Sequence, residues 1–415
     1  MNERSTRLTR RDVGRIAAAS LLAAPAIARA EGAPIAIGYI GPLSGSLSLL
    51  GVSVRDGVKT WVMAANAAGG VAGRKVTLIA EDDGYDPART VAAGKKLAEQ
   101  DKVAAIVAPA GTPGTKALLP LVAASKLPLL FPYAFSHALT DPVQRYAFTT
   151  LPEVRVQMMV LANYILTTLK HTKIAAIYQN DAFGQDAVIG LTERLDRDHV
   201  PLLKLPFDRG TTNFSGVVAQ ARAADVEDVV FLGIPRDAAL VMREAHKLGW
   251  RPQFSGHNAL GDPQTFELAG NLVEGALAVA VMQPLDSGKP AVTQFLATQK
   301  QFLPHTEPTT YSMHGYNAGL LFGEAVKCAK GSTDPDALVA ALQSFDGVDT
   351  GLMAPITYTA TRHAGSLAVA IMQAEHRKWH VISGWLQASC GGIDPGQVRP
   401  PPDPLCRVRP SGRVR

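Results

Sequence analysis

Short apolar runs alternate with amphipathic stretches along the chain from Pro34 onward. The runs are apolar without polar alternation, and the stretches between them have helical spacing: PIAIGYIG, SVRDGVKTWVMAANAAGG, KVTLIAEDDG, TVAAGKKLAEQD, VAAIVAPAG, KALLPLVAASKL and LPLLFPYA. Continuous apolar runs predict strands that are buried on both faces, and the helices between them predict βαβ crossovers in a parallel sheet. The chain up to Thr149 therefore predicts one doubly wound α/β unit.

A second series of the same kind begins after Thr149. It consists of EVRVQMMVLANYILTTL, KIAAIYQND, QDAVIGLTERLDRD, PLLKLPF, FSGVVAQARAAD, DVVFLGI, DAALVMREAHKLG and PQFSGH. Beyond Leu277 follow the run ALAVAVMQP, helices near residues 293–302, 311–329 and 334–343, and the expected strands PITYTA and LAVAIMQAEHRKWHVIS. These last elements are too few for a third domain, so we expect them to complete the first two.

The length of 415 residues agrees with two domains, because single cores stop growing at roughly 250 to 300 residues. Two successive doubly wound units predict two lobes, with a ligand outside the carboxyl ends of the strands.

The first thirty residues have the features of a signal peptide: a basic start, an apolar stretch from Ile16 to Ile27 and a small-residue end at residues 28–30. The pair Arg10-Arg11 fits a twin-arginine signal, and the alternative is an ordinary secretory signal. Either predicts export to the periplasm and a mature chain that begins near Glu31. No later apolar run approaches the ~20 residues that a membrane-spanning helix needs.

The formal charge of +5 is concentrated at the two ends of the chain. Residues 1–30 hold six arginines and two acidic residues, and residues 391–415 hold five arginines and two aspartates, which leaves −2 for the body. A near-neutral body without a basic stripe gives no footprint for nucleic acid. The segment 390–415 is rich in proline and poor in apolar residues, so we expect a disordered or loosely attached tail.

Three cysteines permit one disulfide in an oxidising compartment. Cys390 and Cys406 bracket the proline-rich tail, and a bond between them would tether it. Cys328 lies inside a helical pattern, where we expect a small buried apolar residue rather than a nucleophile.

The turn Gly111 to Thr115 stands where a buried strand leads into a helix. Free backbone N–H groups and two hydroxyls at the positive end of a helix suit a carboxylate or another anion. The alternative is a helix cap by Thr112 or Thr115 and nothing more. No phosphate loop and no dinucleotide-binding glycine motif occurs in the sequence, so we expect no cofactor.

Other candidate chemistry favours structural roles. The acidic group at residues 81–86 lacks the spacing of a calcium loop, so we expect turns and helix caps. His376 and His380 lie in a predicted hairpin, which makes a shared metal face improbable, and we expect no metal. The sequence contains no nucleophile elbow and no zinc-protease motif, so it indicates no catalytic site.

Aromatic and polar residues recur at the predicted strand ends of both units. They are Tyr133, Phe135, Phe183, His257 and Asn258. Each alone is more often a loop-packing residue than a ligand contact, but their shared topological position favours one cleft between the lobes.

The stretch from Ile35 to Leu97 resembles the opening of the type I periplasmic substrate-binding proteins of branched-chain amino acid ABC importers. The resemblance lies in the turn Gly41 to Gly45, the helix end at residues 66–70, the turn at residues 82–87 and the strand end at Gly111 and Thr112. It extends over about residues 34–385. It implies two Rossmann-like lobes, one of residues 31–149 and 281–352 and the other of 150–280 and 353–389, joined by three crossings near Thr149, Ala280 and Met353.

The resemblance also implies a ligand site between these lobes, which close like a hinged jaw. The ligand carboxylate would meet Thr112 and the backbone around Gly111, Tyr133 and Ala134. Leu50, Tyr85 and Tyr311 would form walls of the pocket from the first lobe.

Several positions depart from the family's amino acid binders. Asn258 stands where the second lobe offers an acidic residue to the ligand ammonium, and a neutral amide cannot offset a buried charge in the same way. Phe135 replaces a small hydroxylated residue, Phe183 a common tyrosine, and Pro235 another aromatic residue. Tyr85 and Gly111 occupy the places of the family's N-terminal disulfide. An aromatic or aliphatic carboxylate, or a neutral amide, would suit such a pocket at least as well as leucine.

The sequence therefore predicts an exported, monomeric solute-binding protein that delivers a small organic ligand to an ABC permease in the inner membrane and catalyses no reaction. The main alternative is a receptor of the same fold that passes its signal to a regulatory partner. A third reading is an exported enzyme, which turnover of a bound ligand would reveal.

Overall fold

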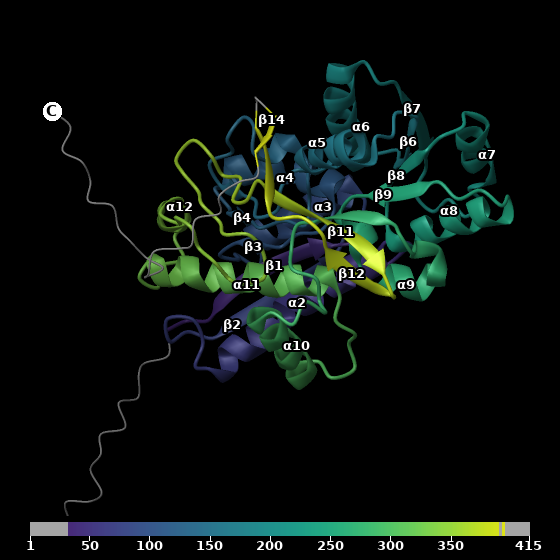
Figure 1. The fold of residues 1–415 in the computed structure, drawn as a ribbon. Helices are drawn as coiled ribbons and strands as arrows, with labels where there is room; N and C mark the ends of the chain where they lie inside the picture. The colour runs from purple at the N-terminus through teal and green to yellow at the C-terminus, as the bar shows by residue number, and fades with distance from the viewer. Residues whose placement is uncertain (1–31, 390–391, 395–415) are drawn as a thin grey trace, which may run out of the picture.

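The structure is a computed structural model that describes residues 32–389 and 392–394. The predicted signal peptide, Cys390, Cys406 and the tail beyond residue 394 lie outside the described residues. The expected periodicity is present: helices and parallel strands alternate in two series, and each series forms one sheet (Figure 1).

The first lobe is built on a parallel five-stranded sheet of order β2-β1-β3-β4-β5. Its strands are β1 (Ile35–Gly41), β2 (Val76–Asp82), β3 (Ile106–Val107), β4 (Leu129–Leu130) and β5 (Ala147–Phe148). Its helices are α2 (Ser48–Ala67), α3 (Pro87–Glu99), α4 (Thr112–Ser125), α10 (Pro290–Phe302), α11 (Thr310–Cys328) and α12 (Pro335–Gln343), with the short 3₁₀ turn η1 (His137–Leu139).

The second lobe is built on a nine-stranded sheet, in which β7-β6-β8-β9-β10 are parallel and the remaining strands are antiparallel. The strands are β6 (Ile174–Gln179), β7 (Leu202–Phe207), β8 (Asp228–Leu232), β9 (Gln253–Gly256), β10 (Leu277–Ala280), β11 (Ala368–Glu375), β12 (Lys378–Val381), β13 (Leu386–Ser389) and β14 (Gly392–Asp394). The helices are α5 (Val154–Tyr164), α6 (Ala182–Leu195), α7 (Ser215–Ala223), α8 (Pro235–Lys247) and α9 (Gln264–Ala269), and the short helical segments are η2 (Ile165–Leu169), η3 (Asp196–Asp198), η4 (Asn258–Gly261) and η5 (Gly270–Val273).

Three local expectations need correction. PITYTA forms no strand; it makes only isolated bridges, such as Ile356 to Val348. The helix expected through Leu169 changes to a π-helical turn at Ile165. Cys328 is disulfide-bonded rather than a simple apolar residue.

Both lobes share one strand order, with β6 and β8 in the places of β1 and β3. The chain leaves the first sheet after β5 and returns to the first lobe after β10. The third crossing, expected near Met353, we place near Ser366, because Ala364 still bridges to Thr149 before β11 begins. The predicted hairpin that holds His376 and His380 is β11 and β12.

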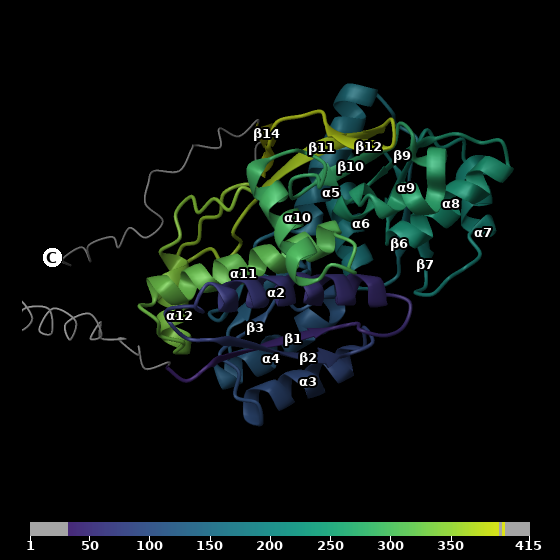
Figure 2. The same cartoon turned by 90° about the horizontal axis from the view of Figure 1, so that it is seen from below.

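Helices α2 and α11 lie side by side along the first lobe (Figure 2). Their backbones approach closely where glycines face the partner helix: a Cβ on Gly57 would meet Ser312 O at 1.9 Å, and one on Gly315 would meet Val54 O at 2.1 Å. The start of α11, which carries Tyr311, is thereby held against the first sheet. Alternate residues of β6 point to opposite faces of the sheet and pack in different hydrophobic clusters. Ile174 and Ala176 belong to one cluster, and Ala175 and Ile177 to the other.

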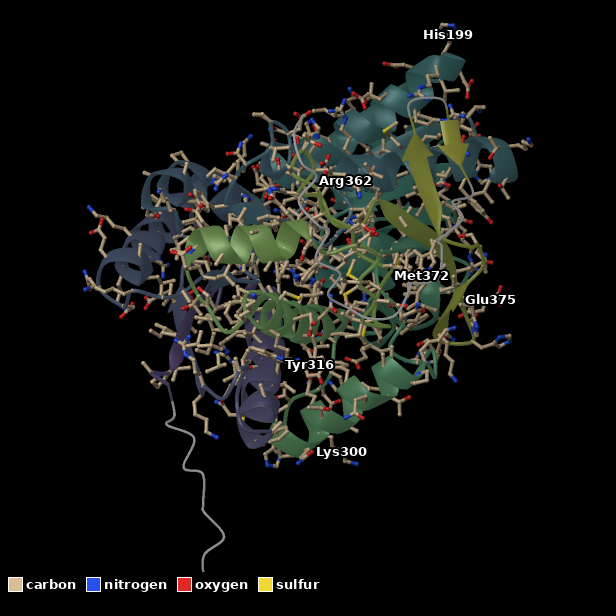
Figure 3. The ribbon with its side chains drawn as sticks, turned by 90° about the vertical axis from the view of Figure 1, so that its left-hand side faces the viewer. His199, Lys300, Tyr316, Arg362, Met372 and Glu375 are labelled. Atoms are coloured by element: carbon tan, nitrogen blue, oxygen red, sulfur yellow. The ribbon has the colours of Figure 1, made fainter. Side chains whose placement is uncertain are left out.

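Side chains sort between interior and surface as the apolar pattern predicts. In Figure 3, Lys300 and Glu375 extend from the surface, whereas Tyr316 and Met372 lie inside the fold. None of the described helices is long and apolar enough to cross a membrane.

Candidate functional site

A cavity lies between the lobes at the carboxyl ends of the strands. Its lining comes from the segments that follow β1, β2, β3 and β4 and from the start of α11 in one lobe, and from the ends of β6, β8 and β9 in the other. The lining residues are Leu47, Leu50, Tyr85, Gly111, Thr112, Tyr133, Phe135, Gln179, Phe183, Gly233, Ile234, His257, Ala259 and Tyr311. This is the switch-point location at which open α/β sheets bind ligands.

The first lobe presents the N-terminus of α4 to the cavity. Gly111 precedes the helix with φ 114°, and no side chain caps it. The first-turn N–H groups of a helix lie outside its i→i−4 ladder, so they carry a partial positive charge toward the cavity. The Thr112 hydroxyl accepts the Phe135 backbone N–H at 3.2 Å, which ties this turn to the loop after β4. The Thr115 hydroxyl is buried with no hydrogen-bond partner among the described residues.

The acidic residues on either side of Tyr85 are turn and cap residues, as the sequence predicted. Asp82 accepts the Leu43 and Gly84 backbone N–H groups at 2.8 and 2.9 Å. Asp86 caps α3. Among the described residues no cluster of histidine, cysteine, aspartate or glutamate could hold a metal ion.

The second lobe presents α6 at the equivalent place, and there Asp181 caps the helix. Its carboxylate accepts the Phe183 and Gly184 backbone N–H groups at 3.0 and 3.1 Å. The other carboxylate oxygen accepts from Gln179 and from the Tyr85 hydroxyl. Burial raises the pKa of Asp181, and this effect outweighs the hydrogen bonds, which lower the pKa. The positive end of α6 is therefore already used within the protein.

Helix α8 also begins at the cavity, after Gly233 and Ile234. Its first turn carries the buried Asp237, which pairs with Arg236. A carboxylate in the first turn offsets the helix dipole. Helices α2, α4, α6 and α8 all begin at the cavity. Those of the second lobe carry an acidic residue at the cap or in the first turn, whereas α2 and α4 of the first lobe have neither.

The walls of the cavity are largely aromatic. Tyr133 packs edge-to-face against Phe135 and Tyr311, with ring centroids 5.0 and 5.2 Å apart. Phe183 of the second lobe faces Phe135 at 6.3 Å and His257 at 4.8 Å. Rings packed in this way present both apolar faces and ring edges to the cavity. No lining residue is acidic.

Two buried histidines behind these rings are held neutral. His257 Nε2 donates to Gly233 O at 2.8 Å, and burial lowers the pKa of His257. His314 Nε2 donates to Phe131 O at 2.9 Å beneath Tyr133, and burial lowers the pKa of His314 to about 4. Neither imidazole supplies a positive charge to the cavity at neutral pH.

Residues 34–378 match the model of the periplasmic binding protein family. The chain belongs to the periplasmic binding protein family. Its two-lobed α/β architecture is the type I fold of that family.

Relatives of this periplasmic binding protein align along most of their length. The Leu/Ile/Val-binding protein homolog 3 of Brucella melitensis is 25% identical over 355 residues, which is 85% of this chain and 94% of the relative. An amino acid binding protein of Pseudomonas aeruginosa is 26% identical over 336 residues, 80% of this chain and 87% of the relative. These relatives are named as binding proteins, not as enzymes.

Solved structures show the same fold. A branched-chain amino acid ABC transporter protein from Thermus thermophilus with bound valine has a TM-score of 0.80 at 19% identity, covering 86% of this chain and 97% of its own. A fatty acid ABC transporter substrate-binding protein from Thermomonospora curvata has a TM-score of 0.77 at 20% identity, covering 88% and 93%.

Eight of the residues named from the sequence of this periplasmic binding protein line the cavity: Leu50, Tyr85, Gly111, Thr112, Tyr133, Phe135, Phe183 and Tyr311. Tyr85 and Gly111, at the places of the family's disulfide, are in contact, since a Cβ on Gly111 would meet the Tyr85 ring at 2.8 Å.

Three other named residues lie outside the lining. Ala134 is buried beside it, and Pro235 is the first residue of α8. Asn258 lines a neighbouring cavity, and its side-chain Nδ2 donates to the Tyr133 hydroxyl at 2.7 Å. This side chain thus holds the lobes together rather than facing the cavity at Phe183.

Six lining residues lie outside the site predicted from the sequence: Leu47, Gln179, Gly233, Ile234, His257 and Ala259. His257 is a polar residue at a predicted strand end beside Asn258, and this position could have identified it. Gln179 is the last residue of β6, the counterpart of strand ends that were used in the first lobe.

Proposed function

We propose that this protein is the exported solute-binding protein of an ABC importer. It takes up a small organic ligand in the interlobe cavity as a monomer, catalyses no reaction on it, and delivers it to a permease in the inner membrane. The family membership supports this proposal, as do the relatives that are named for ABC transport or for binding of branched-chain amino acids or fatty acids. The signal-like N-terminal segment supports export, with the twin-arginine pair as the proposed route.

The proposed class of ligand rests on one observation: the uncapped N-terminus of α4 lies beside apolar walls. An anionic oxygen at a helix N-terminus accepts free N–H groups and interacts favourably with the dipole. Aromatic and aliphatic side chains around it favour an apolar body. The proposed ligand is therefore a small carboxylate with an aromatic or branched aliphatic body.

An α-ammonium group finds no counter-charge in the described lining. The nearby carboxylates already accept hydrogen bonds from the protein: Asp181 as described, and Asp262 from the Thr310 hydroxyl and backbone N–H at 2.6 and 3.1 Å. A buried ammonium without a paired carboxylate is costly. We therefore propose carboxylates that lack an amine over amino acids as ligands.

The test is thermal unfolding of the mature protein with ligand pairs that differ only in the amine. Hydrocinnamate is matched with phenylalanine, and isocaproate with leucine. At a hundredfold excess over Kd, a ligand that binds only the folded state adds ~2.7 kcal/mol, which raises the midpoint measurably.

A raised midpoint with the plain acids and none with the amino acids supports the proposed ligand class. A shift with leucine or phenylalanine alone contradicts the class but keeps the transport function. The neutral amides of the two acids serve as charge controls and are expected to bind more weakly than the acids, because they bring no negative charge to α4.

A further inference from the structure

Tyr85 is a wall of the cavity that its own lobe fixes in place. It follows β2 in a turn with φ 65°, a left-handed conformation that a tyrosine rarely adopts. The Asp83 carboxylate accepts the Tyr85 backbone N–H at 2.8 Å and is itself held by the Thr90 hydroxyl. The ring packs on Gly111, the residue before α4. The position of Tyr85 therefore sets the shape of the cavity next to the helix N-terminus.

The second lobe holds the same residue by three separate contacts. The Tyr85 hydroxyl donates to Asp181 at 3.3 Å. Arg209, in the loop after β7, donates from its guanidinium to the Tyr85 carbonyl oxygen at 2.9 Å. The same guanidinium lies over the Tyr85 ring, 4.9 Å from the centroid. Two of these contacts thus come from one side chain.

Arg209 is exposed and does not line the cavity, so its effect on a ligand acts through Tyr85. Its two contacts join residues of different lobes, and they exist only where the lobes are together. A cation over a tyrosine ring is attracted by the ring even at an exposed site, and a hydrogen bond from a charged donor adds to this attraction. These contacts favour the closed arrangement of the lobes over an open one.

We propose that Arg209 is a positioning residue that latches the closed form through Tyr85. The inference rests on the proposed ligand-binding function of the cavity and deepens it. If the closed form is the one that retains a ligand, the apparent Kd varies inversely with the closed fraction. Loss of the latch then weakens every ligand by the same factor, whatever its body, and speeds dissociation.

The experiment compares Arg209→Ala and Arg209→Lys with wild type and with Arg222→Ala. Arg222 is an exposed arginine on α7 of the same lobe, so its loss changes the net charge equally. Dyes at Lys95→Cys in the first lobe and Lys247→Cys in the second report the closed fraction by energy transfer in the ligand-free protein. Calorimetry and stopped-flow dissociation are carried out with hydrocinnamate and isocaproate.

Arg209→Ala is expected to lower the closed fraction and to weaken both acids by about tenfold, with faster dissociation. Arg209→Lys keeps the charge but not the planar group, so we expect an intermediate effect. A closed fraction in Arg209→Ala equal to that of Arg222→Ala would overturn the inference.

The energy-transfer measurement needs no ligand, so it tests whether Arg209 stabilises the closed form independently of which ligands the protein binds. Failure of both acids to bind wild type would instead count against the proposed ligands. A thermal midpoint of ligand-free Arg209→Ala close to that of Arg222→Ala is the expected sign that the variant remains folded.

Discussion

Helices α4 and α6 occupy the same place in their two lobes but end differently at the cavity. Gly111 precedes α4 without a side-chain cap, whereas Asp181 caps α6 through two backbone N–H groups. The same fold thus exposes a positive helix end in the first lobe and neutralises it in the second. The difference teaches that helix position alone does not make an anion site, because the capping residue decides whether the N–H groups remain free.

The largest expected effect concerns a feature that the two lobes share, a buried neutral histidine: His314 in the first lobe and His257 in the second. In the unfolded chain a histidine binds a proton below its ordinary pKa of 6.5, while buried His314 stays neutral down to about pH 4. Stability is therefore lost as pH falls through this window, by about 3 kcal/mol at pH 4 from His314 alone. Urea unfolding between pH 7 and 4 measures the loss, and His314→Gln is expected to flatten the curve.

Binding should be independent of pH above the ordinary histidine pKa of 6.5. Burial lowers the pKa of His257 at the cavity, so it supplies no added cation to hydrocinnamate between pH 8 and 7. A clear rise in affinity on acidification over this range would show that a histidine, not α4, provides the counter-charge.

Gly111→Ala is expected to have the next largest effect. A Cβ there meets the Tyr85 ring at 2.8 Å and is strained at φ 114°. We expect hydrocinnamate to bind about a hundredfold more weakly, since strain at such positions costs ~1–3 kcal/mol and the helix end is obstructed. Calorimetric titration measures this. Gly216→Ala on α7, where a Cβ meets nothing within 4 Å, is the control and should bind normally.

Thr112→Val removes the hydroxyl that accepts the Phe135 backbone N–H. A buried donor left unpaired costs ~1–3 kcal/mol, so the midpoint of thermal unfolding should fall. Thr112→Ser keeps the acceptor and should retain most of the stability. Equal midpoints in the two variants would mean that the hydroxyl does not position this turn.

Asp181→Ala is expected to have the smallest effect, on the capped helix of the comparison. Loss of a helix cap costs ~1 kcal/mol, and asparagine caps about as well as aspartate. Urea unfolding should therefore show a lower stability for Asp181→Ala than for Asp181→Asn. If both variants match wild type, Asp181 does not satisfy the start of α6 as described.

The contrast between α4 and α6 was only half visible in the sequence. The glycine and threonine turn before α4 pointed to an anion site because residue types alone predict free N–H groups there. Asp181 before α6 is a typical capping residue and so indicates a satisfied helix end, but the predicted site did not take it into account. The apolar runs predicted most strands of the two sheets, although β3 and β4 shorten to two residues each, and β5 and β13 correspond to no predicted run.

Other parts of the site depend on tertiary contacts that no local pattern encodes. Asn258 and His257 are neighbours, and the start of η4 turns one toward Tyr133 and the other toward the cavity. Gly233 and Ile234 line the cavity because they directly follow the carboxyl end of β8. Arg209 reaches Tyr85 from 124 residues away in the sequence, so only the docking of the lobes brings the two together.

The most direct test of the account is a crystal structure of the mature protein with hydrocinnamate. The account predicts the carboxylate within hydrogen-bond distance of the first turn of α4 and the phenyl ring among Tyr133, Phe135 and Phe183. A carboxylate bound instead at the start of α6 or α8, or at His257, would contradict the claim that the uncapped helix of the first lobe selects the ligand.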